Sequence, residues 1–156
     1  MTETFIRIQE HDFDQAVEYA HLEEQAPRIG AVVTFCGLVR EFDNGKGLYL
    51  EHYPQMAENT LLTIVEQAAK QWPIISTRII HRIGTLGLGE KIVFVGVNSE
   101  HRDDAFNACK FIMDFLKTDA PFWKKALTHT SETDDYWIEA KDSDREKKQA
   151  WDNKHK

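Results

Sequence analysis

The sequence predicts an α+β fold, with a largely antiparallel sheet and flanking helices. Strand-like segments follow one another in pairs between the helical segments, whereas a parallel α/β fold alternates single strands with helices. A chain of 156 residues is long enough to bury one hydrophobic core. We therefore expect a single domain over residues 1–156, with a charged C-terminal tail from about residue 142.

The first half of the chain predicts three strands and two helices. Residues 4–8 alternate as a strand does, and Asp12 is placed to cap a short helix. Residues 31–39, AVVTFCGLV, are apolar on both faces and rich in branched side chains, which indicates a central buried strand. The next residues, EFDNGKG, contain an Asn-Gly pair typical of a hairpin that leads to a returning strand at 48–52. A core helix over about 56–72 completes this half.

The second half predicts two pairs of strands around a third helix. Strands at 77–83 and 91–97 are separated by GTLGLGE, which we interpret as a turn because its glycines lack the spacing of a phosphate-binding loop. Residues 91–97 are almost continuously apolar, as in a central strand. The third helix opens near Ser99, and strands at 122–127 and 136–140 follow it. The charged C-terminal remainder is typical of a short surface helix and tail.

Composition excludes several classes of protein. No apolar run approaches the ~20 residues that a membrane helix needs. No basic segment followed by an apolar one opens the chain, so we expect a cytoplasmic protein. Cys36 and Cys109 lie too far apart for a zinc knuckle or a C-x-x-C pair, and we expect both to be reduced and buried. The histidines show no metal-binding spacing, so we predict neither a metal nor a cofactor.

The charge distribution indicates a small anionic ligand. The net charge of −7 argues against a nucleic-acid binder, which needs a basic face. Residues 101–125 nevertheless contain five Lys/Arg against four Asp/Glu, so this segment is locally basic in an acidic protein.

Two pairs of residues in this segment are candidates for chemistry. Lys117 is placed at a helix end and Lys124 just after the stop at Pro121, so that two amines can face one small volume. Partial burial would lower a lysine pKa toward the range useful for proton transfer, whereas a helix C-terminus favours the charged form. His101 and Arg102 open the helix, where backbone amides and both side chains can receive an oxyanion. Solvated lysines and an ordinary polar helix start are the alternatives.

Several motifs in order resemble one known family. AVVTFCGLVR, LEHYP, HRIGTLGLGEKIVFVGV, the pair His101-Arg102 and FIMDFLKTDAPFWKK resemble the large, catalytic subunit of molybdopterin synthase, over roughly residues 30–140. The resemblance implies an α/β-hammerhead type of fold. It also implies a homodimer of large subunits within a heterotetramer, each binding a small ubiquitin-like sulfur-carrier subunit whose C-terminal Gly-Gly carries a thiocarboxylate. Two sulfur transfers to cyclic pyranopterin monophosphate would then give the molybdopterin dithiolene, in molybdenum cofactor biosynthesis.

The resemblance also implies the residues of the site. The implied catalytic residues are Lys117, which matches an essential lysine at the inserted tail, and Lys124, which matches the lysine beside it. Arg40 and the pair His101-Arg102 match residues that line the pterin and phosphate pocket, and the pair would come from the neighbouring large subunit. The implied substrate-binding set is Leu38, Val39, Arg40, His101, Arg102, Lys117, Lys124, Lys125, Ala126 and Lys141.

The sequence departs from the family pattern at three places. Leu38 stands where a basic residue is expected, Lys141 replaces an arginine, and the loop at 41–47 is short. Lysine cannot reproduce the planar, bidentate grip of arginine, which weakens the prediction for Lys141. Two other classes of function stay open. One is a non-catalytic module that binds a ubiquitin-like tail, and the other is an enzyme that acts on another phosphorylated metabolite without a protein partner.

Overall fold

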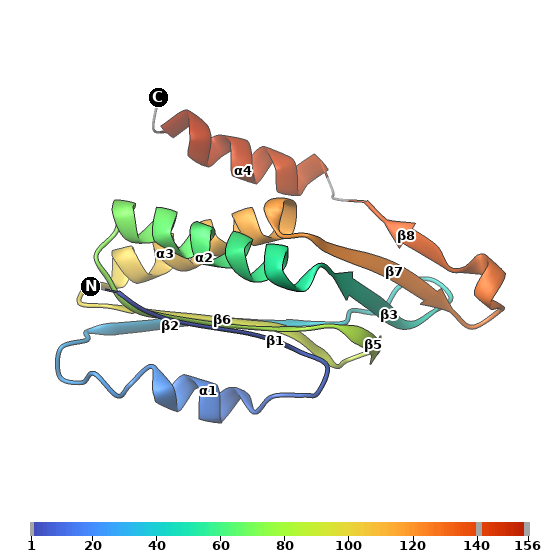
Figure 1. Ribbon diagram of the computed structural model, residues 1–156, viewed down its shortest axis with the longest axis horizontal. Helices are drawn as coiled ribbons and strands as arrows, with labels where there is room; N and C mark the ends of the chain where they lie inside the picture. Colours follow the sequence, from blue (N-terminus) through green and yellow to red (C-terminus); the bar gives the residue numbers. More distant parts are fainter. Residues whose placement is uncertain (1, 140–141, 155–156) are drawn as a thin grey trace.

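The computed structural model describes residues 2–139 and 142–154 and confirms the α+β prediction. These residues form two sheets of four strands each, with helices on both sides of the first (Figure 1). Sheet A is mixed, since one of its three strand pairs is parallel, and sheet B is antiparallel throughout. Sheet B continues from one end of sheet A, and the chain crosses between the two several times.

Sheet A forms the centre of a layered body. Its strands, in spatial order, are β1 (Glu3–Gln9), β4 (Ile74–Arg82), β6 (Lys91–Ser99) and β2 (Ala31–Leu38). The helix α1 (Gln15–His21) covers one face, and α2 (Pro54–Gln71) and α3 (Arg102–Asp119) cover the other (Figure 1). The helix α4 (Asp142–Lys154) packs on α3, on the side away from the sheet.

Sheet B has the spatial order β5 (Gly84–Gly87), β3 (Gly45–His52), β7 (Phe122–Thr128) and β8 (Tyr136–Ile138). A short 3₁₀ helix at Glu132–Asp134 lies between β7 and β8. Because β7 follows α3 directly, the helix end and the start of this strand meet at one turn.

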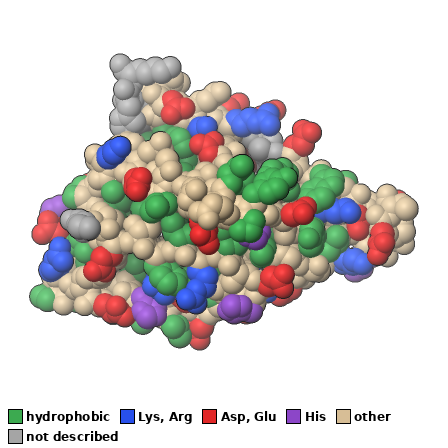
Figure 2. All heavy atoms as spheres, in the orientation of Figure 1, with side chains coloured by type: hydrophobic (Ala, Val, Ile, Leu, Met, Phe, Trp, Pro, Cys, Tyr) green, Lys and Arg blue, Asp and Glu red, His purple; other side chains and the backbone are tan. Residues whose placement is uncertain are grey.

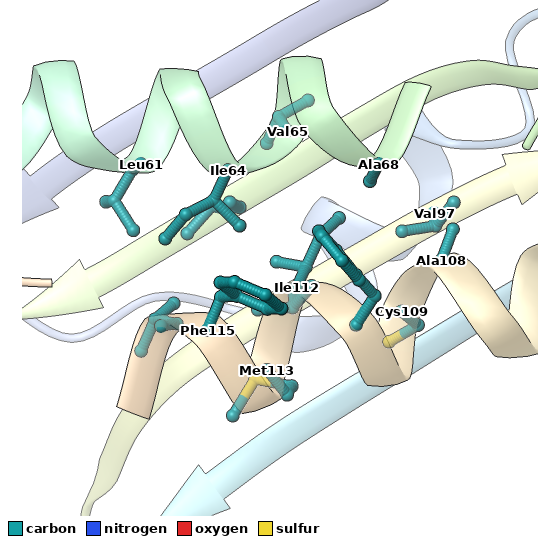
Figure 3. Close-up of a cluster of buried hydrophobic side chains, with 14 of the residues drawn as sticks. Leu61, Ile64, Val65, Ala68, Val97, Ala108, Cys109, Ile112, Met113 and Phe115 are labelled. Atoms are coloured by element: carbon teal, nitrogen blue, oxygen red, sulfur yellow. The ribbon is translucent and has the colours of Figure 1, made fainter. Parts of the chain in front are cut away.

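The main core lies between sheet A and the helices α2 and α3. Figure 3 shows side chains of α2 facing those of α3, among them Leu61, Ile64, Ala68, Ala108, Cys109 and Ile112. Trp151 of α4 joins this core, with its ring 5.5 Å from that of Trp72 and 5.6 Å from that of Phe111. Cys109 is buried as predicted, and burial raises the pKa of its thiol to about 12. Cys36 is only half-buried.

The prediction that residues 31–39 form a central strand is wrong. In the described residues β2 pairs with β6 alone and forms an edge of sheet A, whereas β6 is central as predicted. The predicted hairpin is also wrong, because β2 and β3 belong to different sheets. The chain changes sheets at Val39, whose N–H donates to the Glu90 carbonyl and whose carbonyl accepts from the Gly89 N–H.

Two smaller predictions are corrected at element ends. Asp14, and not Asp12, caps α1, because the Asp14 carboxylate accepts from the backbone N–H groups of Ala16 and Val17. The Asp12 carboxylate accepts from the adjacent Phe13 N–H and pairs with Lys91. Residues 84–87, which were interpreted as part of a turn, form β5 against β3.

Candidate active site

Lys117 and Lys124 lie on either side of the turn between α3 and β7. Lys117 is exposed in the last turn of α3. The helix ends because Ala120 is extended, with φ −67° and ψ 130°, as the residue before a proline prefers. Strand β7 begins at Phe122. The prediction that a helix end and a restarted strand position these two lysines is therefore realised in the backbone.

The side chain of Lys124 belongs to the inner face of sheet B. Lys124 pairs with Leu50 on one side and Ile138 on the other, so these three residues share a face. Leu50 is 1% exposed, which shows that this face turns toward the core. Lys124 itself is half-buried. Its amine is thus held at the edge of the core, on the side of the sheet that carries Phe122.

A stacked pair of rings supports this corner of the site. The imidazole of His81, in β4, lies parallel to the ring of Phe122, with centroids 3.8 Å apart. Burial lowers the pKa of His81 to about 3, the hydrogen bond to Arg82 opposes this shift, and the charge of Lys124 adds to it. His81 is therefore neutral at physiological pH. Because the Arg82 carbonyl oxygen can only accept, the nitrogen 2.8 Å from it, Nδ1, carries the proton.

Three other residues predicted to bind the substrate, Lys125, Val39 and Ala126, differ in whether their side chains can reach a ligand. Lys125 lies on the opposite face of β7 from Lys124, and its amine is 5.7 Å from the centre of the Trp137 ring. The side chains of Val39 and Ala126 are buried, at 2% and 0% exposure. Neither of these two side chains is therefore accessible to a ligand beside Lys124.

Leu38 and Arg40 are both exposed where β2 ends. Since β2 is antiparallel to β6, Leu38 lies beside Lys91, at the start of β6. Helix α3 returns along β6 and β2, so its C-terminal end reaches the same end of sheet A. Arg40 and Lys117 consequently belong to one end of the molecule.

His101 and Arg102 lie at the other end of α3. The helix begins at Arg102, whose side chain is 81% exposed, and it ends at Asp119. At 1.5 Å per residue, Arg102 and Lys117 are about 22 Å apart along the helix axis. Gly30, directly before β2, packs closely against the backbone just before α3. A Cβ at this position would lie 2.2 Å from the Glu100 carbonyl oxygen, so a larger residue would not fit. One chain therefore does not bring the His101-Arg102 pair to the two lysines.

The remaining predictions concern residues or features outside this corner. Lys141 lies outside the described residues.

Within residues 2–139 and 142–154, no three His, Cys, Asp or Glu side chains form a group that could hold a metal ion. No helix in that part of the chain is long and apolar enough to cross a membrane. On the face shown in Figure 2, basic side chains are scattered among acidic ones.

Comparison with known proteins places the chain in a family. The model of the MoaE protein family matches residues 8–119, which is more than half of the chain. The chain belongs to the MoaE family. The matched region runs from β1 to the end of α3, and so includes Arg40, His101, Arg102 and Lys117.

Similar proteins cover nearly the whole length. The molybdopterin synthase catalytic subunit of Vibrio cholerae is 50% identical over 150 residues, which are 94% of this chain and 97% of that protein. The solved structure of the molybdopterin biosynthesis MoaE protein from Burkholderia ambifaria has a TM-score of 0.81 at 42% identity, covering 95% of this chain and 97% of that chain. The molybdopterin synthase structure from Staphylococcus aureus gives 0.76 at 31% identity, covering 85% and 95%.

One residue near this MoaE site was not a candidate in the sequence. Nothing in the sequence singles out His81, because its neighbours in the chain give no sign of the ring that stacks on it. The alternation of side chains along β7 could have shown from the sequence that Lys124 and Lys125 face opposite ways. Adjacent strand residues point to opposite faces, so Lys124 and Lys125 were never both able to line one pocket from this strand.

Proposed function

We propose that this chain is the catalytic subunit of molybdopterin synthase. It transfers sulfur from the C-terminal thiocarboxylate of a small ubiquitin-like subunit to cyclic pyranopterin monophosphate, and so builds the dithiolene of molybdopterin. The membership of the MoaE family and the near full-length similarity to catalytic subunits support this function. The observation that carries the mechanism is the position of Lys117 and Lys124 around one turn. We place the reaction in the cytoplasm, where thiols such as the two free cysteines of this chain stay reduced.

The chemistry needs positive charge more than it needs a nucleophile. The thiocarboxylate sulfur displaces an oxygen substituent from a carbon of the pterin side chain, so a C–S bond replaces a C–O bond and the oxygen leaves with a proton. A thioester then joins tail and substrate. Water then cleaves the thioester, so the sulfur stays on the substrate and the tail leaves as a carboxylate. Lys117 donates a proton and stabilises the oxyanions that develop in these steps, with Lys124 beside it. Arg40 binds the phosphate from the same end of the molecule.

The full pocket is assembled from two copies of the chain. Arg102 lies about 22 Å from Lys117 along α3, so the predicted phosphate ligands His101 and Arg102 cannot join the lysines of their own chain. In a symmetric dimer the same pair from a second copy completes each site. Each chain then supplies lysines to one site and the His101-Arg102 pair to the other.

The central test is product formation by purified proteins. The chain is mixed with the thiocarboxylated small subunit and cyclic pyranopterin monophosphate, and the dithiolene product is measured. We expect product with the wild type and almost none with Lys117→Ala. Lys110→Ala is the matched control, because Lys110 is an exposed lysine of the same helix whose amine binds Asp114. Normal product formation by Lys117→Ala would remove the proposed role. A complex that forms without product in the wild type would favour the non-catalytic binding module.

Mixed dimers test the two-copy pocket. Lys117→Ala and the double variant His101→Ala/Arg102→Ala are co-expressed with different affinity tags, and activity is compared with that of each variant alone. About half of the dimers are mixed, and each of these has one fully wild-type site of two, so activity should return to about a quarter of the wild-type level. If the pocket came from a single chain, the mixture would be no more active than its components.

A further inference from the structure

The connector between β2 and β3 carries Arg40, and its backbone is fixed on the β2 side. Val39 is 2% exposed, its N–H donates to the Glu90 carbonyl at 2.8 Å, and its carbonyl accepts from the Gly89 N–H at 2.8 Å. The turn between β5 and β6 therefore binds both polar groups of the Val39 backbone. Because consecutive Cα atoms are about 3.8 Å apart, the Cα of Arg40 lies that close to a fixed point.

The connector is fixed again at Phe42, two residues after Arg40. The half-buried ring of Phe42 packs on a buried cluster that consists of Val39, Leu48, Leu50 and Leu86. The Phe42 carbonyl accepts from the Gly45 N–H at 2.9 Å, which closes a turn. The ring lies so close to Gly45 that a Cβ at this position would overlap with it. The glycine at position 45 thus makes room for the ring.

Asn44 ties the same turn to the strand that carries Lys124. Its φ of 57° lies in the left-handed region, which Asn adopts more readily than most residues. Its Nδ2 donates to the Thr130 Oγ1 at 2.8 Å, and its carbonyl accepts from the His129 N–H at 3.0 Å. His129 and Thr130 directly follow β7, which carries Lys124. The connector is therefore attached to the end of β7 as well as to the turn before β6.

We propose that Phe42 is a positioning residue, which holds Arg40 in place before the anionic substrate binds. Only Arg40 and Glu41 lie between the two fixed points, Val39 and Phe42, so the backbone of Arg40 is restrained from both sides. A residue that is already ordered loses less conformational entropy when it binds a ligand. The proposal rests on the proposed function only for the ligand, the phosphate of the substrate, because the restraint on Arg40 is a property of the fold.

The restraint can be measured without any ligand. The order parameter S² of the Arg40 N–H, from ¹⁵N relaxation, should be about 0.85 in the wild type and below about 0.6 in Phe42→Ala. Tyr19→Ala is the control and should leave this value unchanged, because Tyr19 is an exposed aromatic residue of α1, which covers sheet A. A wild-type value below about 0.6, or an unchanged value in Phe42→Ala, would overturn the proposal.

Steady-state kinetics test whether the restraint serves substrate binding. With the thiocarboxylated small subunit, Phe42→Ala should raise KM for cyclic pyranopterin monophosphate about tenfold and change kcat less than about threefold, as for a loss of binding alone. Phe42→Leu keeps an apolar side chain on the cluster, so its KM should stay within about threefold of the wild type. A fall in kcat with an unchanged KM would contradict a role in binding.

A double-mutant cycle tests whether Phe42 acts through Arg40. In an Arg40→Ala background, Phe42→Ala should change KM less than about twofold, because no guanidinium is left to position. An equal effect of Phe42→Ala in both backgrounds would overturn the proposal and leave Phe42 a structural role only. A wild type that forms no dithiolene would refute the proposed function, whereas the order parameter of Arg40 would still decide whether Phe42 restrains it.

Discussion

The imidazole of His81 and the ring of Phe122 lie face to face, 3.8 Å apart and within 5° of parallel. His81 belongs to sheet A and Phe122 opens the strand of sheet B that carries Lys124. His52, the cross-strand partner of Phe122, is stacked on its ring at a longer 6.1 Å. This contact fixes where the second sheet begins relative to the first, and with it the position of the turn between the two lysines.

The pH dependence of stability should report on His81. Its pKa is lowered to about 3 in the folded protein, so the unfolded chain binds more protons between that value and its own pKa, which is about 6.5. The contribution of this group to stability is fully present above pH 6.5 and is lost as the pH falls toward 3. His81→Phe keeps a stacking ring without a titrating group. Urea unfolding at pH 7, 6 and 5 should therefore show a slope smaller by up to about 1.4 kcal/mol per pH unit in the variant. Equal slopes would contradict a neutral, buried His81.

The two lysines of β7 should differ in activity. Lys124 shares the inner face with Leu50, whereas Lys125 lies on the outer face near Trp137. We expect Lys124→Ala to lower the rate of dithiolene formation by about 10²-fold or more, as for the loss of a group that assists proton transfer. Lys125→Ala should cost less than about tenfold, because its amine points away. Single-turnover rates with a thiocarboxylated partner decide the comparison, and equal losses would place both amines in one pocket.

Asn98 should be important for stability. It is fully buried, its Oδ1 accepts from the Ser76 N–H at 2.6 Å, and its Nδ2 donates to the Leu22 carbonyl at 2.7 Å. Asn98→Ala leaves both backbone groups without these partners, which should lower the free energy of unfolding by about 2–5 kcal/mol. Asn107→Ala, at an exposed position of α3, should change it by less than about 0.5 kcal/mol. Urea denaturation measures both, and a small effect at Asn98 would mean that water replaces the side chain.

Trp151 should hold α4 on the body of the protein. Its ring is 6% exposed, contacts Trp72 and Phe111, and its Nε1 donates to the Asp114 carboxylate at 2.8 Å. Trp151→Ala should release α4 and speed tryptic cleavage at Arg145, Lys147 and Lys148. If α4 unfolds together with the rest, the cost should be about 3–5 kcal/mol. Trp137→Ala, at a 51% exposed position, is the control and should alter neither quantity.

Local patterns in the sequence predicted most elements of the fold. The helices α2 and α3 and the strand β6 were found because their apolar spacing reflects contacts on their own faces. The position of β2 was not found, because strand order depends on partners distant in the chain.

The site was predictable only in part, because some of its contacts also join residues that are distant in the chain. Lys117 and Lys124 are separated by one turn, so the sequence alone placed them on its two sides. The stack of His81 on Phe122 joins two sheets and leaves no local pattern. The distance from Lys117 to Arg102 follows from helix length alone, and it separates the predicted phosphate ligands His101 and Arg102 from the lysines of the same chain.

The surroundings of the two cysteines affect which sulfur can react. Burial raises the pKa of Cys109 to about 12 and also raises that of Cys36. Since the thiolate is the reactive form, burial favours the less reactive neutral thiol at both positions. A thiocarboxylate or thioester that reaches this subunit therefore meets little competition from the thiolates of Cys36 and Cys109. Packing in this way favours reaction of the sulfur that is delivered over reaction of the sulfur that is resident.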